Sequence, residues 1–112
     1  MTDCIFCRIA RGELPAQVVG GDDDWLAFHD LSPVAPTHIL VVPRRHVESL
    51  AASSPGDVEL LGRLVSAARD LAAELGLDHY RMVVNNGRGA GQSVFHLHLH
   101  LLGGRDFSWP PG

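Results

Sequence analysis

The sequence has few cysteines, no long apolar run and no excess of basic residues, and each of these absences argues against a large class of proteins. It has no apolar run of membrane-spanning length, and a typical apolar run covers only residues 39–42. It has only two cysteines, three residues apart, which argues against a secreted scaffold held by several disulfides. It also has no excess of basic residues, since 9 Lys+Arg stand against 13 Asp+Glu for a net charge of −4. We therefore expect neither a membrane nor a nucleic acid as partner.

The remaining composition is typical of a small folded domain. Apolar residues make up 46% and charged residues 20% of the 112 positions. This composition and length predict a single globular domain that spans residues 1–112, with no room for a second core. The N-terminal residues show no basic segment followed by an apolar stretch, so we expect no secretory signal. The predicted location is the cytoplasm, where the two thiols stay reduced and are free to bind a metal.

Local patterns predict an α+β fold. The spacing of apolar residues predicts a short helix over 4–10 and strands over 17–20, 25–30, 38–43, 80–85 and 94–101. A long helix is expected to begin near Ser54, a good N-cap followed by Pro55, and to end at Gly76. Its expected buried stripe consists of Val58, Leu61, Val65, Ala68, Ala72 and Leu75. These elements indicate an antiparallel sheet of about five strands packed with the long helix and the short N-terminal helix.

Histidine is unusually frequent for a chain of this length, with seven residues, three of them within five positions. Because strand side chains alternate between faces, the strand predicted over 94–101 carries His96, His98 and His100 on one face and Leu97, Leu99 and Leu101 on the other. The leucines suit burial beneath the helix, and the histidines suit a cleft. Three interpretations of the histidines stand at this point: a solvated edge strand, a metal chelate, or a nucleophile with phosphate ligands.

Several motifs together resemble a known family. Residues 96–102 follow the pattern His–φ–His–φ–His–φ–φ, where φ is apolar. The accompanying motifs are Phe28-His29-Asp30, Pro36-Thr37-His38, Asn85, Gly91-Gln92-Ser93, Leu102-Gly103-Gly104-Arg105 and Trp109-Pro110-Pro111-Gly112. In this order and spacing, they make the chain similar to the histidine triad superfamily, in particular its nucleotide-binding branch. The Gly-Gly and Trp-Pro-Pro-Gly endings favour that branch over the dinucleoside-polyphosphate hydrolases.

The resemblance implies a reaction. His98 would attack the α-phosphorus of a purine nucleoside 5′-phosphoramidate, an AMP or GMP conjugate, and form a nucleotidyl-histidine that water hydrolyses. His100 and His38 would place N–H groups on the phosphate, with Ser93 beside them. Neither the amine, the purine nor the general acid is assigned by these residues. The implied assembly is a two-fold dimer, with the long helix and the strand over 80–85 as its surfaces.

The resemblance also implies a nucleotide pocket. Asp30 would accept hydrogen bonds from the ribose hydroxyls, since a carboxylate can accept two. The apolar walls around the purine would be Ile5, Phe6, Ile9, Phe28 and Leu31. The glycine-rich loop before the histidines could be a plain hairpin loop or an anion-binding nest. The resemblance favours the nest, with the phosphate contacts Asn85, Gly91, Gln92, Ser93, His98 and His100.

The two cysteines leave two interpretations open. A redox pair is disfavoured because no βαβ context surrounds the motif, which leaves inert buried thiols or half of a zinc site. Some members of the superfamily hold a structural zinc, and the matching positions here are Cys4, Cys7, His46 and His96. We expect such a zinc to take no part in catalysis.

Alternative functions stay open from the sequence. These are a nucleotide-binding regulatory module with incidental catalysis, a dinucleoside polyphosphate hydrolase, and a zinc-dependent hydrolase that uses His96, His98 and His100 as ligands. The last conflicts with geometry, because three positions along one strand do not converge easily on one ion.

Overall fold

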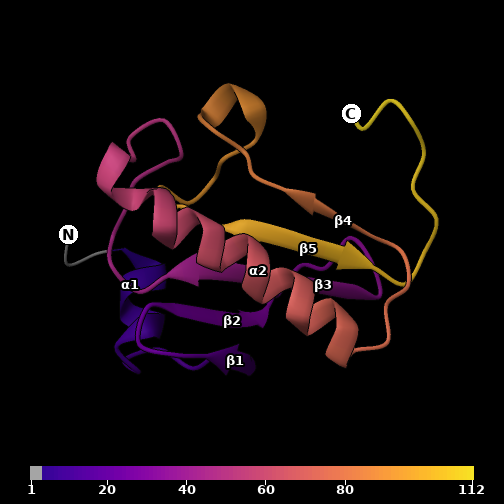
Figure 1. The fold of residues 1–112 in the computed structure, drawn as a ribbon, viewed down its shortest axis with the longest axis horizontal. Helices are drawn as coiled ribbons and strands as arrows, with labels where there is room; N and C mark the ends of the chain where they lie inside the picture. The colour runs from indigo at the N-terminus through magenta and orange to yellow at the C-terminus, as the bar shows by residue number, and fades with distance from the viewer. Residues whose placement is uncertain (1–3) are drawn as a thin grey trace.

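A five-stranded antiparallel sheet forms the centre of the computed structural model, which describes residues 4–112 (Figure 1). The strand order is β1-β2-β3-β5-β4, so that β3 is central and β1 and β4 are the edges. The strands are β1 (Val18–Gly21), β2 (Trp25–His29), β3 (Thr37–Pro43), β4 (Tyr80–Val83) and β5 (Leu99–Gly103). This arrangement confirms the predicted α+β class. The β-branched run of β3 occupies the centre of the sheet, where all its residues after Thr37 are buried.

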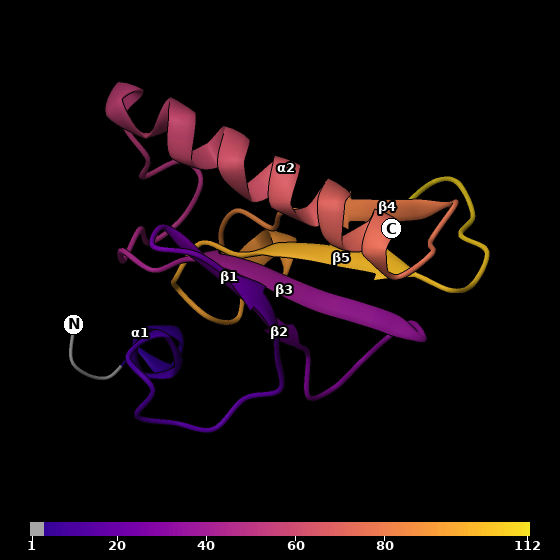
Figure 2. The same ribbon diagram turned by 60° about the horizontal axis from the view of Figure 1, so that its bottom comes forward.

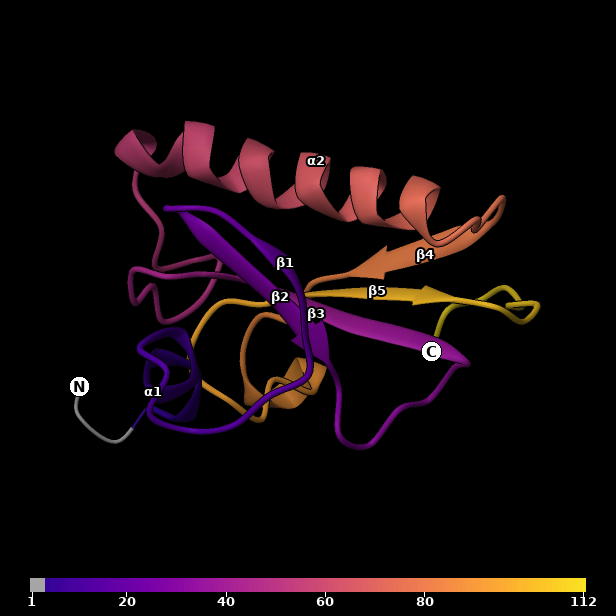
Figure 3. The same cartoon turned by 90° about the horizontal axis from the view of Figure 1, so that it is seen from below.

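The two helices cover opposite faces of the sheet (Figures 2 and 3). The long helix α2 (Val58–Glu74) packs on one face over a core that includes Ile39, Val41 and Leu101. The short helix α1 (Ile5–Ala10) lies on the other face, where Phe6 packs with Phe28 and Leu40. Among the described residues, neither helix has the length and hydropathy needed to cross a membrane.

The start of the long helix differs slightly from expectation. Residues Pro55–Asp57 form a 3₁₀ turn, and the α-helix begins only at Val58. The carboxylate of Asp57 accepts a hydrogen bond of 2.8 Å from the Ser54 backbone N–H and also pairs with Arg45. The hydrogen bond to Ser54 is the main cause that lowers the pKa of Asp57. The predicted cap is therefore present, with the acidic residue as its acceptor.

The predicted buried stripe of α2 is confirmed at Ala68 and Ala72, with Leu61 partly buried against the core, and was wrong at its other three positions. Val58, Val65 and Leu75 are 68%, 49% and 47% exposed, respectively. The buried residues are Leu64, Ala67, Ala68, Leu71 and Ala72. The helix carries apolar residues around more than one face, so periodicity alone could not choose between neighbouring rows. The row with Leu64 and Leu71 faces the sheet, and Val58 and Val65 are left facing outward.

The last strand is shorter than predicted. β5 begins at Leu99, whereas residues 94–98 form no strand ladder, and the N–H of Leu97 instead donates to the carbonyl of Val47 at 2.6 Å. Alternation nevertheless persists through this extended segment, because Leu97, Leu99 and Leu101 all enter the core beneath α2. The triad histidines therefore lie on the α1 side of the sheet, as the alternation predicted. The other strand boundaries shift by one or two residues.

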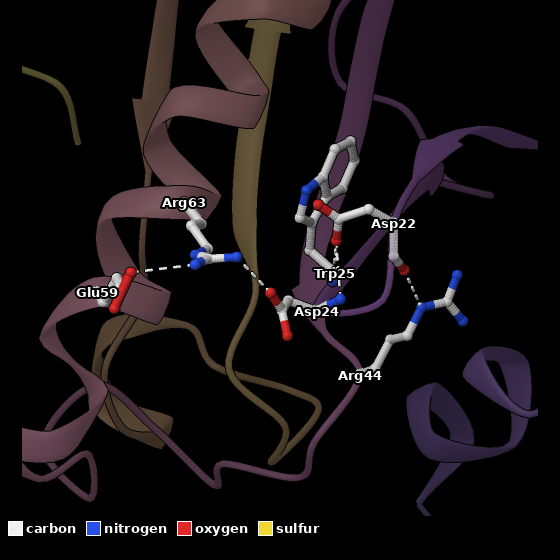
Figure 4. A network of polar contacts seen from close by, with 6 residues as sticks. All are labelled: Asp22, Asp24, Trp25, Arg44, Glu59 and Arg63. Atoms are coloured by element: carbon white, nitrogen blue, oxygen red, sulfur yellow. Dashed lines mark hydrogen bonds and ion pairs between the residues drawn. The ribbon is translucent and has the colours of Figure 1, made fainter.

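The turn between β1 and β2 ties the sheet to both helices (Figure 4). The side chain of Asp22 accepts hydrogen bonds from the backbone N–H groups of Asp24 and Trp25, which closes the turn. Arg63 of α2 pairs with Asp24. Arg44, at the end of β3, donates to the carbonyl of Asp22 and to that of Ala10 at the end of α1. Both helices are thus anchored near the same corner of the sheet.

The two leucines near the end of α2 test which row of the helix is buried. We expect Leu71→Ala to lower the free energy of unfolding by about 2–5 kcal/mol, because Leu71 is packed in the core. Leu75→Ala, at the exposed end of the helix, should cost less than about 1 kcal/mol. Urea unfolding followed by circular dichroism measures both. Equal losses in the two variants would contradict this packing.

Candidate active site and metal cluster

A cavity of about 370 Å³ opens between α1 and the α1-facing side of the sheet. Nine of the residues that the sequence predicted for nucleotide binding line it: Ile5, Phe6, Ile9, Phe28, Asp30, Leu31, Ser93, His98 and His100. The lining combines apolar side chains from α1 and β2 with the polar side chains of Asp30, Ser93 and the two histidines. The fold therefore brings these nine residues from three distant segments to one cavity.

The orientation of His98 follows from one hydrogen bond. Its Nδ1 lies 2.7 Å from the carbonyl oxygen of His96, and because a carbonyl can only accept, Nδ1 carries the proton. In the neutral ring Nε2 then holds the lone pair. The ring is 6% exposed and packs edge-on against Phe6, with 5.2 Å between ring centroids. The hydrogen bond to His96 thus selects the tautomer of His98 in which Nε2 is available as a nucleophile.

His38 and His100 form a second ordered pair. The backbone N–H of Val34 donates to Nδ1 of His38 at 3.1 Å, so the proton of the neutral His38 ring is on Nε2. This Nε2 lies 2.9 Å from Nδ1 of His100 and donates to it. The proton of the neutral His100 ring is then on its Nε2, which is buried and has no hydrogen-bond partner among the described residues. The chain of hydrogen bonds therefore ends in one unused N–H donor.

Burial keeps this pair uncharged at neutral pH. Burial lowers the pKa of His38, and the nearby Asp30 carboxylate opposes that shift only in part. Burial also lowers the pKa of His100 to about 4, assisted by the neighbouring His98 and His38. Both rings are thus neutral hydrogen-bond donors near pH 7.

Asp30 stands where β2 ends. One carboxylate oxygen, Oδ1, accepts from the backbone N–H of Ser32 at 2.8 Å, and Oδ2 lies 3.4 Å from Nε2 of His38. The side chain keeps 20% of its surface exposed and lines the cavity. Asp30 therefore retains acceptor capacity for hydroxyl groups of a ligand. Its neighbour His29, to which the sequence assigned no role, also lines the cavity.

The glycine-rich loop is placed only in part as expected. Ser93 lines the cavity, whereas Asn85, Gly91 and Gln92 are not among its lining residues. Gln92 is 2% exposed, and its Oε1 accepts from the N–H of Gly87 while its Nε2 donates to the carbonyls of residues 48 and 94. The expected contact of the Gln92 side chain with phosphate thus finds no free polar group. Instead, this side chain braces the loop that leads to Ser93.

Cys4, Cys7, His46 and His96 form a compact cluster beside the cavity. Nδ1 of His96 lies 3.3 Å from Sγ of Cys4, 3.5 Å from Sγ of Cys7 and 3.2 Å from Nδ1 of His46. Sγ of Cys7 lies 3.3 Å from Nδ1 of His46. The cysteines come from the start of α1, and the histidines from the segments after β3 and before β5. The fold thus unites the four predicted ligands.

The donor geometry fits a tetrahedral metal ion. Zn–N bonds of about 2.0–2.1 Å and Zn–S bonds of about 2.3 Å imply distances between ligand atoms of roughly 3.3–3.8 Å, close to those of the cluster. Nε2 of His96 lies 2.7 Å from the carbonyl oxygen of Pro43 and donates to it, so the lone pair of Nδ1 points into the cluster. A thiol pair and two inward imidazole nitrogens are a zinc donor set.

A zinc ion shared by the three triad histidines is not supported by the geometry. Within residues 4–112, the sets of three or more close metal-ligating groups are the cluster above and Asp30 with His38 and His100. Neither set includes His98. The second set is already explained by the hydrogen bond between its two histidines.

Some parts of the site were not anticipated from the sequence. The backbone N–H of Val34 and the carbonyls of Pro43 and His96 set the protonated nitrogen of one histidine each. Backbone groups leave no residue-type signal, so no motif could have revealed them. Val94 also lines the cavity, and only its position directly after Ser93 could have indicated this from the sequence.

Comparisons with known proteins show the family of the chain. The model of the HIT domain matches residues 11–107. A HIT-like protein of Synechocystis sp. is 53% identical over 111 residues, which cover 98% of this chain and 97% of the relative. The crystal structure of a HIT family hydrolase from Legionella pneumophila superposes with a TM-score of 0.96 at 48% identity, covering 98% of this chain and all of that one.

A metal-containing relative is also similar. The crystal structure of a Zn-bound histidine triad family protein from Mycobacterium smegmatis has a TM-score of 0.81 at 32% identity, covering 94% of this chain and 77% of that one. The family match spans most of the chain. The Synechocystis protein and the Legionella pneumophila hydrolase each match 98% of the chain, at 53% and 48% identity. The chain therefore belongs to the HIT domain family.

Proposed function

We propose that this protein is a nucleotide-binding hydrolase that cleaves purine nucleoside 5′-phosphoramidates, as in the nucleotide-binding branch of the family. The observation that carries the proposal is the pairing of a lone pair on His98 with an unused N–H on His100 in one cavity. A nucleophile beside a hydrogen-bond donor suits attack on phosphorus. A similar structure bears the name of a HIT family hydrolase.

The residues that line the cavity favour one orientation of a bound nucleotide. The apolar lining residues Ile5, Ile9 and Leu31 would pack against a flat purine, while Phe6 and Phe28 contact each other, with 5.5 Å between ring centroids. Asp30 lies beside the histidine pair, with Oδ2 3.4 Å from Nε2 of His38, and would accept hydrogen bonds from the ribose hydroxyls. The α-phosphate would then lie at His98 and Ser93. The cavity thus offers a chemical group for each part of a nucleoside 5′-phosphate.

The reaction proceeds in two displacements. In the first, Nε2 of His98 forms a bond to phosphorus while the phosphorus–nitrogen bond breaks. The departing nitrogen keeps the bonding electron pair and leaves as the amine once protonated. In the second, the oxygen of water forms a bond to phosphorus while the bond between phosphorus and Nε2 breaks. The bonding pair returns to Nε2, a proton of the water passes to solvent, and the nucleoside monophosphate leaves. Nε2–H of His100 donates to a phosphoryl oxygen whose charge grows in each transition state, and His38 holds His100 in the tautomer that makes this possible.

We propose that the four-residue cluster holds one structural zinc ion per chain. A bound zinc would join α1 to the segment after β3 and to the segment before β5. No step of the reaction needs it, because both the nucleophile and the donor are supplied by histidines outside the cluster. Both cysteines are free thiols, which suits a reducing location such as the cytoplasm.

We also propose that two copies form a symmetric dimer. Val58 and Val65 leave an apolar row on the outside of α2, and β4 is an edge strand with Tyr80 39% exposed. α2 lies over the sheet at β3 and β5, and β4 is the edge strand next to β5 (Figure 1). An apolar row beside an open strand edge suits an isologous contact.

The first test concerns the nucleophile. We expect His98→Ala to reduce hydrolysis of an adenosine 5′-phosphoramidate by at least about 10³-fold, because no other side chain supplies the attacking nitrogen. His79→Ala, at an exposed histidine, is the matched control and should retain full activity. Rapid acid quench of the wild type followed by mass spectrometry should show a nucleotide attached to His98.

Other outcomes of this test would favour other functions. Tight nucleotide binding without turnover in the wild type would favour a regulatory module. Faster cleavage of dinucleoside polyphosphates than of phosphoramidates would favour the polyphosphate hydrolases. Turnover that stops on chelation and returns only with added zinc, while the fold persists, would favour a metal-dependent reaction.

The second test concerns the metal. Protein purified without chelators should contain about one zinc per chain, and Cys4→Ser should lose it, because a structural site needs four ligands. We expect the variant to unfold at a lower temperature and still to turn over substrate at temperatures where it is folded. Elemental analysis and calorimetry measure these effects. Metal-free wild-type protein from such a preparation would contradict the zinc site.

The third test concerns the dimer. The wild type should sediment as a dimer, and Val65→Arg should shift it toward the monomer, because a charge would be buried in the contact. Arg11→Glu, an exposed change of charge at the end of α1 on the opposite face of the sheet, is a control for altered charge alone. A wild-type monomer at micromolar concentration in sedimentation would contradict the proposal.

A further inference from the structure

The C-terminal segment holds the loop that orients the second histidine pair. Nε of Arg105 donates to the carbonyl of Val34 at 3.1 Å, across a sequence separation of 71 residues. The N–H of the same Val34 donates to Nδ1 of His38. Arg105 and the catalytic pair are therefore linked through one residue of the loop over 31–36, although Arg105 does not line the cavity.

This loop depends on contacts with other segments for its position. It forms neither helix nor strand, and Leu31 and Val34 are 91% and 60% exposed. Beside the Arg105 contact, Gly104 packs closely on Pro36, where a Cβ on residue 104 would lie only 2.8 Å from Cβ of Pro36. Gly104 has φ +90, in the left-handed region that favours glycine. Two consecutive residues of the C-terminal segment thus fit against the loop.

The Arg105 side chain is itself oriented before it meets the loop. Its guanidinium lies over the ring of Phe107, 4.2 Å from the centroid, and Nη1 donates to the carbonyl of Asp106 at 2.9 Å. Less conformational freedom is therefore lost when Nε bonds to the loop.

The protonation pattern of the histidine pair depends on the loop. While the Val34 N–H occupies Nδ1 of His38, the His38 proton stays on Nε2 and the His100 proton stays on its own Nε2, the buried donor without a partner among the described residues. If Val34 moves away, His38 can carry its proton on Nδ1. His100 must then donate from its own Nδ1, and its Nε2 carries a lone pair in place of the N–H. A lone pair repels a phosphoryl oxygen, and the donor is lost.

We propose that Arg105 is a positioning residue for catalysis, which holds the loop at Val34 and thereby keeps His38 and His100 in the tautomers that stabilise the transition state. The inference rests on the proposed reaction for its effect on rate. Its effect on the tautomers does not depend on any substrate.

The test compares two arginines that stack on the same ring. Arg105→Met removes the donor to Val34 and keeps an aliphatic side chain against Phe107. Arg81→Met is the matched control, because Arg81 also lies over Phe107, at 5.2 Å, and bonds to the carbonyl of Ser108 rather than to the loop. Arg105→Lys, which can still donate one hydrogen bond, is the conservative variant. Ring ¹⁵N chemical shifts of His38 and His100 report the tautomers, and steady-state kinetics with the adenosine phosphoramidate report kcat and KM.

We expect Arg105→Met to lower kcat by about 10-fold, because the donor is misplaced, and to change KM by less than about 2-fold. The ring signals of His38 and His100 should move toward the opposite tautomers. Arg105→Lys should recover most of both effects, and Arg81→Met should show neither.

Unchanged ring signals in Arg105→Met would overturn the inference, and so would equal effects in Arg81→Met. If the wild type cleaves no phosphoramidate, the proposed function fails, and the ring signals still decide whether Arg105 sets the tautomers. If the wild type cleaves it while Arg105→Met keeps full kcat, this inference alone fails.

Discussion

The hydrogen bond from Nδ1–H of His98 to the carbonyl of His96 is the constraint on which the site depends. It decides which nitrogen of His98 carries the lone pair, and it requires the backbone of His96 to stay in place. The side chain of His96 meets that requirement, because it is fully buried between the carbonyl of Pro43 and the cysteine-histidine cluster. His96 of the cluster and His98, the proposed nucleophile, are therefore held in place together, two residues apart in one segment.

The same segment also unites the two halves of the fold. On one side, Leu97, Leu99 and Leu101 enter the core under α2, where most of the buried apolar surface lies. On the other side, the histidines face α1, whose Phe6 contacts the rings of His96 and His98. A slip of one residue would place histidines in the core and leucines in the cavity, so the register of the site is set by the cost of burying polar rings.

Burial serves a second purpose in the histidine pair. A low-dielectric surrounding disfavours the charged ring, so that His38 and His100 stay neutral and each has one donor and one acceptor. A neutral pair can be ordered by a single backbone group, here the N–H of Val34, whereas a charged ring would donate from both nitrogens. The direction of the final N–H is thus a property of the loop as well as of the rings.

Residue types and spacing determined the α+β class and the alternation of the triad segment, and the resemblance to the histidine triad superfamily implied the four residues of the cysteine-histidine cluster. These depend on local periodicity and on motifs that keep their order along the chain. The tertiary structure decided the buried row of α2, the role of Gln92 as a brace, and the tautomer of each histidine. These features depend on which backbone groups and which helix faces meet when distant segments come together, as where Val34 contacts His38 and Arg105. A sequence pattern cannot reveal them, because backbone carbonyl and amide groups are nearly the same in every residue type.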